Sequence, residues 1–245
     1  MNPDLQSLQP YPFEKLRTLK RGVEPPPGLD HINLSVGEPR HPAPEFVRQA
    51  LVAHLDDLST YPGTKGLPVL RKSIARWLQQ RFKLPEMLNP DTQVLPVNGT
   101  REALFAFAQA MIHRGASEVD ERPTVLMPNP FYQIYEGAAL LAGAEPVYLN
   151  CTEENRFLPD FDAVPEAVWE RCQLLYLCSP GNPTGAVLSL ATLQTLIDLA
   201  DHHDFIIASD ECYSEIYPDE NQPPVGLLQA CAGMGRTDYR RCVVF

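Results

Sequence analysis

Two short segments of the chain place polar side chains directly after apolar runs. Asn182 lies in SPGNPTG, which follows the run QLLYLC, and Asp210 follows the run FIIAS. A loop, a helix-length segment and a strand-length segment separate the two residues, as in a right-handed βαβ crossover. We therefore expect Asn182 and Asp210 at the same edge of neighbouring parallel strands, with an amide and a carboxylate facing one cleft. The alternative for Asp210 is a cap or a surface acid at the start of a loop.

Two further loops carry residues that could hold a flat, phosphorylated ligand. Gly99, Thr100 and Arg101 open an apolar helix after the run QVLPV, so free backbone amides and a hydroxyl form a cradle for phosphate. Tyr132 follows the run TVLMP and could stack on an aromatic ring. Taken alone, the first group is more typical of an ordinary helix start capped by Thr100, and such a tyrosine more often packs in the core or its rim.

The elements that would position these loops alternate between strands and helices. The hydrophobic pattern predicts helices over 43–55, 67–82, 101–113, 132–142 and 190–203, and strands over 93–97, 124–127, 146–149, 173–178, 205–209 and from 242 onward. This alternation indicates an α/β fold with a layered, mostly parallel sheet. The Pro-rich stretches near 25–27, 37–44 and 223–224 are typical of loops or extended arms.

Composition excludes several classes of function. Hydrophobic residues make up 44% and charged residues 21% of the chain, which is typical of a globular protein rather than a disordered or membrane protein. The net charge of -11 disfavours partners such as nucleic acid or an anionic membrane. No signal peptide and no membrane-spanning run is evident, so we expect a cytoplasmic protein.

The six cysteines are scattered along the chain. They show neither CxxC pairs nor the His/Cys spacing of zinc ligands. We therefore expect reduced thiols, with no disulfide framework and no metal site.

The two segments SPGNPTG and SDECYSEIY resemble the paired signature of class I and II aminotransferases, which are pyridoxal-phosphate enzymes of fold type I. The resemblance covers nearly the whole chain, because further motifs follow in the family's order: LSVGEP (34–39), YPGTKGLPVLRKSIARW (61–77), NGTREAL (98–104) and PNPFYQIY (128–135). The N-terminal segments YPFEKLR and HINLSVGEPRHPAP are most similar to bacterial succinyldiaminopimelate aminotransferases.

This resemblance implies a fold and a division into domains. Residues 43–245 would form the three-layer α/β/α large domain that binds pyridoxal phosphate, incomplete at its C-terminus. Residues 1–42 would form an N-terminal arm and a segment of the small domain. The C-terminal small domain would be largely absent.

The resemblance also assigns roles around the pyridine ring of the cofactor. Asp210 would lie against the ring nitrogen, and the physics agrees, because a buried opposite charge keeps that nitrogen protonated and the ring able to act as an electron sink. Asn182 and Tyr213 would donate hydrogen bonds to the phenolic oxygen, and Asn182 would also lie beside the substrate. Tyr132 would stack on the ring.

Further roles concern the phosphate, the substrate and a second subunit. Gly99, Thr100 and Arg101 resemble the phosphate cup, where the helix contributes its positive end. Tyr61 resembles a tyrosine that reaches the phosphate across a dimer interface, so a homodimer is implied. Gly37 matches the segment near the substrate carboxylate. The alternatives are that Tyr61 is an aromatic packing residue and that Gly37 forms a simple turn.

The lysine that forms the Schiff base in this family normally follows the aspartate by a few dozen residues. No lysine follows Asp210 here, and the final run CVVF is of the kind that leads into the lysine segment. We therefore expect the chain to lack its catalytic lysine and the substrate-binding arginine, and to be inactive alone. Lys65, Lys72 and Lys83 are poor substitutes, because they precede the cofactor-binding strands and fit solvated charges.

The expected activity is transfer of an amino group between an amino acid and a 2-oxo acid in lysine biosynthesis. The resemblance suggests N-succinyl-LL-2,6-diaminopimelate, with 2-oxoglutarate and glutamate, as the substrates. The alternatives are another pyridoxal enzyme of this fold, such as a carbon–sulfur lyase, and a noncatalytic cofactor-binding fragment. A nucleotide-binding protein is disfavoured, because neither GxGxxG after the first strand nor GxxxxGK[ST] is present.

Overall fold

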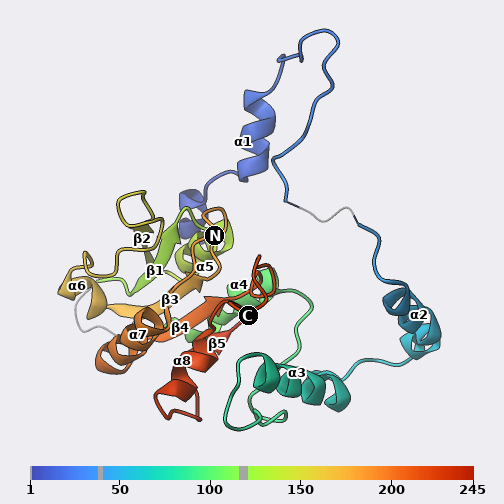
Figure 1. Cartoon of the computed structure of the whole chain (residues 1–245). Helices are drawn as coiled ribbons and strands as arrows, with labels where there is room; N and C mark the ends of the chain where they lie inside the picture. The colour runs from blue at the N-terminus through green and yellow to red at the C-terminus, as the bar shows by residue number, and fades with distance from the viewer. Residues whose placement is uncertain (1, 38–40, 116–120) are drawn as a thin grey trace. The chain divides into compact units, whose positions relative to one another are not determined.

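A computed structural model describes residues 2–37, 41–115 and 121–245 of the chain (Figure 1). The chain forms two compact units, each described here by itself. The first contains Met1–Leu8 and Lys65–Phe245, and the second contains Gln9–Thr64. The sequence-based boundary after residue 42 does not coincide with this division and stays a prediction.

A five-stranded sheet forms the centre of the first unit. Its strand order is β2-β1-β3-β4-β5, and every neighbouring pair is parallel. The strands are β1 (Thr124–Asn129), β2 (Glu145–Asn150), β3 (Cys172–Cys178), β4 (Ile206–Asp210) and β5 (Cys242–Val244). The expected parallel sheet is confirmed.

Seven helical segments accompany the sheet in the described part of this unit: the first three precede β1, and the other four connect successive strands. They are η1 (Pro3–Ser7), α3 (Pro68–Arg81), α4 (Thr100–Met111), α5 (Gln133–Leu141), α6 (Glu166–Trp169), α7 (Leu190–His203) and α8 (Leu227–Gly233). Helix α7 has the bounds that the sequence predicts, because Ser189 caps its first turn and Asp204 ends it in the left-handed conformation at φ 61°.

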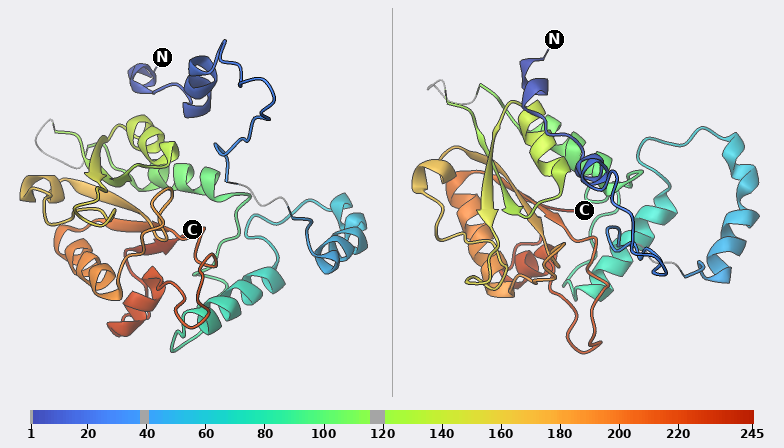
Figure 2. Two further views of the ribbon diagram at one scale, coloured as in Figure 1. Left: turned by 45° about the horizontal axis from the view of Figure 1, so that its top comes forward. Right: turned by 90° about the horizontal axis from the view of Figure 1, so that it is seen from above.

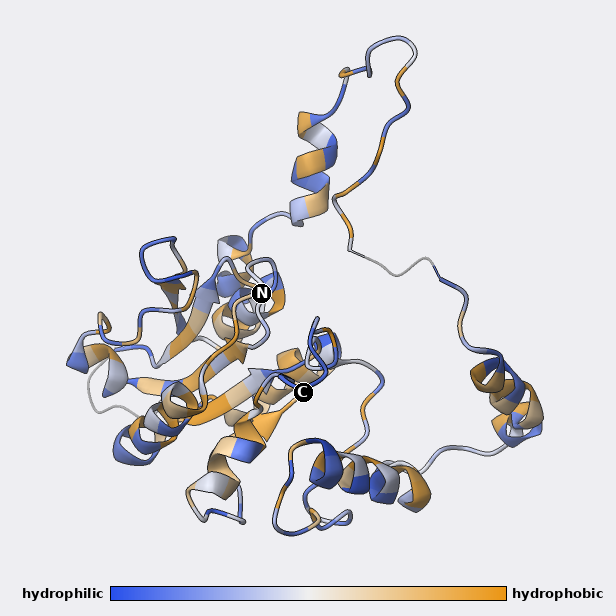
Figure 3. Cartoon of the chain, viewed as in Figure 1, coloured by the Kyte–Doolittle hydropathy of each residue, from blue (hydrophilic) through white to orange (hydrophobic). Residues whose placement is uncertain are grey.

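Alternating side chains of the strands build two hydrophobic cores. Val125 of β1 and Tyr176 of β3 belong to the core under α4 and α5, and Leu126 and Leu177 belong to the core under α7 and α8. Figure 2 shows these helix pairs on opposite sides of the sheet, and Figure 3 shows hydrophobic residues concentrated on the strands between them. This arrangement confirms a three-layer α/β/α unit.

The expected strand over 93–97 is wrong. The structure has no strand there, and Leu95 and Val97 are exposed. Pro96 lacks the backbone N–H that a strand would donate, and it packs close to Gly66, where a Cβ would lie 2.9 Å from Pro96 Cγ. The segment therefore leads into α4 without strand pairing.

The second unit contains two short helices and a 3-10 helix: α1 (Pro12–Leu19), α2 (Glu45–Ala53) and η2 (Leu55–Ser59). Many of its apolar side chains are exposed, including Leu34, Leu58 and Tyr61. None of the helices in the described parts of the chain has both the length and the apolar character needed to cross a membrane.

Candidate active site

The carboxyl ends of β3 and β4 bring Asn182 and Asp210 to one edge of the sheet, as the sequence predicts. Cys178, the last residue of β3, is the register partner of Asp210, the last residue of β4. The Ser179 amide donates to the Asp210 carbonyl over 3.2 Å and continues the ladder past the strand end. The proline loop that carries Asn182 therefore starts beside Asp210.

The carboxylate of Asp210 is buried and held at both oxygens. The Tyr135 hydroxyl donates to Oδ2 over 2.7 Å, and the Cys212 amide donates to Oδ1 over 3.3 Å. Tyr135 is fully buried and stacks on Tyr176 with ring centroids 4.5 Å apart. Burial and the charge of Asp210 raise the pKa of Tyr135 far above its ordinary value, so its hydroxyl stays protonated and acts as a donor.

The loop SPGNPTG holds Asn182 through backbone hydrogen bonds. The Gly181 amide donates to the Ala186 carbonyl over 2.8 Å, and the Gly185 amide donates to the Gly181 carbonyl over 2.7 Å. Gly185 has φ +70°, a conformation that side chains with a Cβ rarely adopt. Asn182 Nδ2 donates to the Tyr213 hydroxyl over 2.8 Å, so the two predicted donors lie side by side.

The start of α4 presents free amides, because the first turn of a helix leaves its N–H groups without helical partners. Gly99 is the N-cap in an extended conformation and Thr100 is the first helical residue, so the alternative of a Thr100 cap is wrong. A Cβ on Gly99 would lie 2.7 Å from Glu102 Oε2. Thr100 Oγ1 lies 3.5 Å from Cys212 Sγ, which joins this helix start to the loop after Asp210.

Tyr132 connects the helix start to the core around Asp210. Arg101 Nε donates to the Tyr132 hydroxyl over 2.8 Å. The Tyr132 ring meets that of Tyr135 edge to face, with centroids 5.8 Å apart. Contacts through Tyr135 and Cys212 connect Thr100, Arg101 and Tyr132 to Asp210, and Gly99 adjoins Thr100. Asn182 and Tyr213 contact each other on the loops that follow β3 and β4, beside Asp210.

Two predicted residues lie in the second unit. Tyr61 is 95% exposed there, and Gly37 is exposed beside a segment whose residues 38–40 lie outside the described parts of the chain. Their roles at the site stay predictions.

Sequence reasoning missed Tyr135 and the amide of Cys212. Tyr135 lies three positions after Tyr132 at the start of α5, and this spacing places both rings on one side of the helix. That spacing was a usable signal for a second tyrosine at the site.

Burial raises the pKa of the Cys212 thiol to about 11, so this thiol is protonated at neutral pH.

The chemistry of this donor set fits pyridoxal phosphate. A buried carboxylate suits a protonated ring nitrogen, and the amides and hydroxyl at the start of α4 suit a phosphate. Asn182 and Tyr213 bring an amide and a hydroxyl that can donate to an anionic oxygen.

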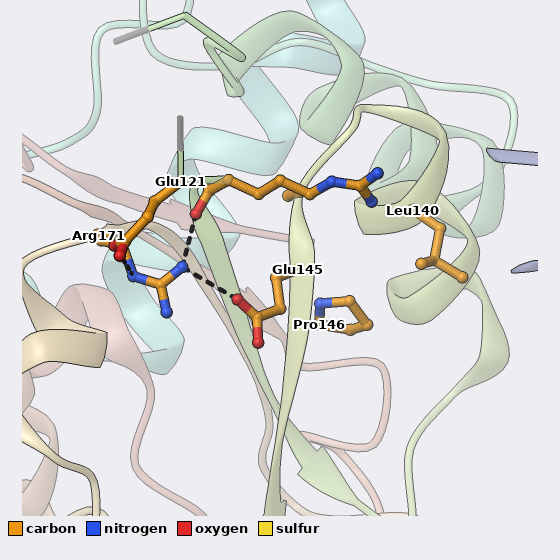
Figure 4. A pocket seen from close by; sticks show the side chains of 7 residues that line it. Glu121, Leu140, Glu145, Pro146 and Arg171 are labelled. Atoms are coloured by element: carbon orange, nitrogen blue, oxygen red, sulfur yellow. Dashed lines mark hydrogen bonds and ion pairs between the residues drawn. The ribbon is translucent and has the colours of Figure 1, made fainter. Parts of the chain in front are cut away.

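The opposite edge of the sheet also has a hollow, lined by charged residues at the amino ends of the strands (Figure 4). Arg171 is one of its lining residues, with Nη1 3.0 Å from Glu145 Oε2 and Nε 3.4 Å from Glu121 Oε2. These ion pairs neutralise the arginine, and Asp210 and Asn182 are at the other end of the strands. The hollow is therefore not part of the candidate site.

Comparisons with known proteins agree with this geometry. The model of the family "Aminotransferase class I and II" matches residues 30–239. An LL-diaminopimelate aminotransferase of Dehalococcoides mccartyi is 36% identical over 228 residues, and one of Gloeobacter violaceus is 36% identical over 227 residues. Each match covers 92% of this chain, but only 56% and 55% of those relatives.

Solved structures show the same fold. The crystal structure of an aminotransferase from Neisseria meningitidis has a TM-score of 0.91 and 45% identity, over 100% of this chain and 60% of that chain. Aminotransferase AspB from Helicobacter pylori has a TM-score of 0.86 and 38% identity, over 97% of this chain and 59% of that chain. This chain therefore spans a little over half the length of its relatives. Because the family model matches most of the sequence, the chain belongs to the class I and II aminotransferases, a family of pyridoxal-phosphate enzymes of fold type I.

Proposed function

We propose that this chain provides the pyridoxal-phosphate site of an aminotransferase that acts on a diaminopimelate-type amino acid in lysine biosynthesis. The observation that carries the proposal is the buried Asp210 carboxylate, held at both oxygens beside the Asn182 loop and the start of α4. The relatives named LL-diaminopimelate aminotransferase support the substrate class. The succinylated form is the finer version of the proposal, and it rests on the N-terminal motifs alone.

In this proposal Asp210 is the residue that favours protonation of the cofactor's ring nitrogen. Bound pyridoxal phosphate supplies an electron sink for the α-carbon of the amino acid while its ring nitrogen is protonated. The Asp210 carboxylate favours this protonated form, because an opposite charge in a buried position stabilises a cation. Tyr135 and the Cys212 amide keep the carboxylate in one orientation.

The residues around Asp210 would bind the cofactor and orient it. Gly99, Thr100 and Arg101 would hold the phosphate at the start of α4, and Tyr132 would stack on the ring. Asn182 and Tyr213 would donate hydrogen bonds to the phenolic oxygen.

Two residues of the second unit are proposed to contact the substrate and the phosphate of a second subunit. In this proposal Gly37 would bind near the substrate carboxylate, and Tyr61 would reach the phosphate of a second subunit in a homodimer.

Direct binding of the cofactor tests the proposal. The purified chain is titrated with pyridoxal phosphate by equilibrium dialysis, with Asp210→Ala and, as the matched control, Asp198→Ala, which removes an exposed acid on α7. We expect Asp210→Ala to weaken binding at least tenfold, with affinity unchanged in Asp198→Ala. Equal affinities in all three proteins would contradict the proposal.

The same sample tests the expectation about lysine. Borohydride reduction followed by peptide mapping detects any lysine joined covalently to the cofactor. A label on Lys65, Lys72 or Lys83 would overturn the expectation that none of these lysines acts as the anchor. Binding without a label supports a cofactor site that holds its ligand noncovalently.

A further inference from the structure

Three side chains that can ligate a metal ion lie together at the amino edge of the sheet. Glu166 opens α6, and His202 and His203 close α7. One ligand atom from each lies within 4.8 Å of the others. Helices α6 and α7 precede β3 and β4, so this group lies at the ends of those strands opposite to Asn182 and Asp210.

His203 is the most constrained member of the group. Its side chain is only 6% exposed, stacks on Trp169 and meets the ring of His202 edge to face with centroids 4.5 Å apart. Within the described residues its ring nitrogens form no hydrogen bond, and Nε2 lies 3.7 Å from Glu166 Oε1. This distance is too long for a hydrogen bond, so a nearly buried imidazole points at a carboxylate without bonding to it.

The spacing suits a shared cation. Two ligands bound to one tetrahedral Zn²⁺ at about 2.0–2.1 Å lie roughly 3.3 Å apart, so the group needs only small side-chain rotations to close around an ion. Glu166 is 68% exposed and His202 is exposed, so both are free to rotate toward the fixed His203.

We propose that Glu166, His202 and His203 form a transition-metal site for an ion such as Zn²⁺ or Ni²⁺, which ties α6 to α7. Two imidazoles and one carboxylate favour these ions over Mg²⁺ and Ca²⁺, which prefer oxygen ligands. The histidines occupy the last turn of α7, where the negative end of the helix dipole favours a cation.

Sequence spacing does not reveal this group, and the sequence predicts no metal site. Neighbouring positions on a helix point about 100° apart, so adjacent histidines rarely share a ligand. Here α7 ends at His203, the chain turns at Asp204, and Trp169 of α6 holds the His203 ring beside Glu166.

Trp169 provides an internal reporter of the site. The chain has two tryptophans, so Trp77→Phe leaves Trp169 as the single one. The untagged 245-residue variant is titrated with NiCl₂, and we expect quenching of its fluorescence with one ion per chain. Zn²⁺ should compete with Ni²⁺ and should raise Tm by several degrees, while Mg²⁺ at the same concentration should do neither.

Paired substitutions separate this site from other metal-binding groups. Glu166→Gln and His202→Asn change exposed side chains, and each should weaken Ni²⁺ binding at least tenfold while leaving the metal-free Tm unchanged. Glu170→Gln and His113→Asn are the matched controls, because they remove an exposed acid and an exposed histidine outside the group, and affinity should be unaffected. Unchanged affinity in Glu166→Gln and His202→Asn, or equal quenching by Mg²⁺, would overturn the proposal.

Discussion

The hydroxyl of Tyr135 donates a hydrogen bond of 2.7 Å to Oδ2 of Asp210. Tyr135 lies on α5 and Asp210 ends β4, so the contact joins a helix to the strand end that it covers. Because Tyr135 is fully buried and its pKa is far above neutrality, the hydrogen always lies on the tyrosine and the carboxylate always accepts it. The contact therefore fixes the orientation of Asp210.

Tyr135→Phe should destabilise the chain and weaken cofactor binding. The substitution keeps the ring stacked on Tyr176 and removes only the donor to Asp210. A hydrogen bond to a charged group contributes about 1.5–3 kcal/mol, so we expect a loss of that size in the free energy of unfolding, measured with urea. We also expect a loss of several-fold in affinity for pyridoxal phosphate.

Tyr176→Phe is the control for this prediction. It removes the hydroxyl that donates to the Leu104 carbonyl over 2.8 Å and leaves the Asp210 carboxylate untouched. It should cost about 1 kcal/mol in the free energy of unfolding and leave cofactor affinity unchanged. A similar loss of affinity in both variants would show that Tyr135 acts through packing rather than through its hydroxyl.

The parallel sheet and the neighbouring positions of Asn182 and Asp210 follow from the sequence, because a helix between two apolar runs forces a parallel crossover. The strand predicted over 93–97 is absent because a short apolar run does not show whether a partner strand exists. Pro96 argues against a strand here, because proline has no backbone N–H to donate to a partner strand.

The contacts of Asp210 with Tyr135, and the Glu166, His202 and His203 group, depend on side chains from separate elements. Spacing along the chain predicts a common face within one helix, as for Tyr132 and Tyr135. It does not predict which atom of one element meets which atom of another.

Glu211 should make stability depend on pH. Burial raises the pKa of its carboxyl to about 7, although Leu227 N and Ser209 Oγ donate to it. The folded state then binds this proton more tightly than the unfolded state, in which the pKa of this carboxyl is about 4.5. The contribution to stability is therefore fully present below about pH 4.5 and is lost as the pH rises through about 7.

The variant Glu211→Gln tests whether the stability of the chain falls as the pH rises. The amide oxygen can still accept from Leu227 N and Ser209 Oγ, and no charge forms at high pH. Between pH 5 and pH 8 we expect the parent chain to lose up to about 3 kcal/mol more unfolding free energy than the variant, measured with urea at each pH. The exposed Glu153→Gln should behave as the parent chain, and a parent chain that gains stability toward pH 8 relative to Glu211→Gln would contradict the assignment.

Gly185→Ala should weaken the Asn182 loop. Gly185 has φ +70°, where an alanine is strained, and its amide closes the turn onto the Gly181 carbonyl. We expect a cost of about 1 kcal/mol in the free energy of unfolding and weaker binding of pyridoxal phosphate, because Asn182 is displaced. Gly63→Ala, at a position without positive φ or a close neighbour, is the control and should leave both quantities unchanged.

Thr100→Val should weaken binding of the phosphate and not of the ring. The variant keeps the shape of the side chain at the start of α4 and removes its hydroxyl, while the helix amides remain. Pyridoxal phosphate should bind about tenfold more weakly, because a hydrogen bond to a charged group is lost, and pyridoxal, which lacks the phosphate, should bind as before. Thr195→Val, whose hydroxyl donates to the Ala191 carbonyl on α7, should change neither affinity. Equal losses for both ligands in Thr100→Val would place the threonine beside the ring instead of the phosphate.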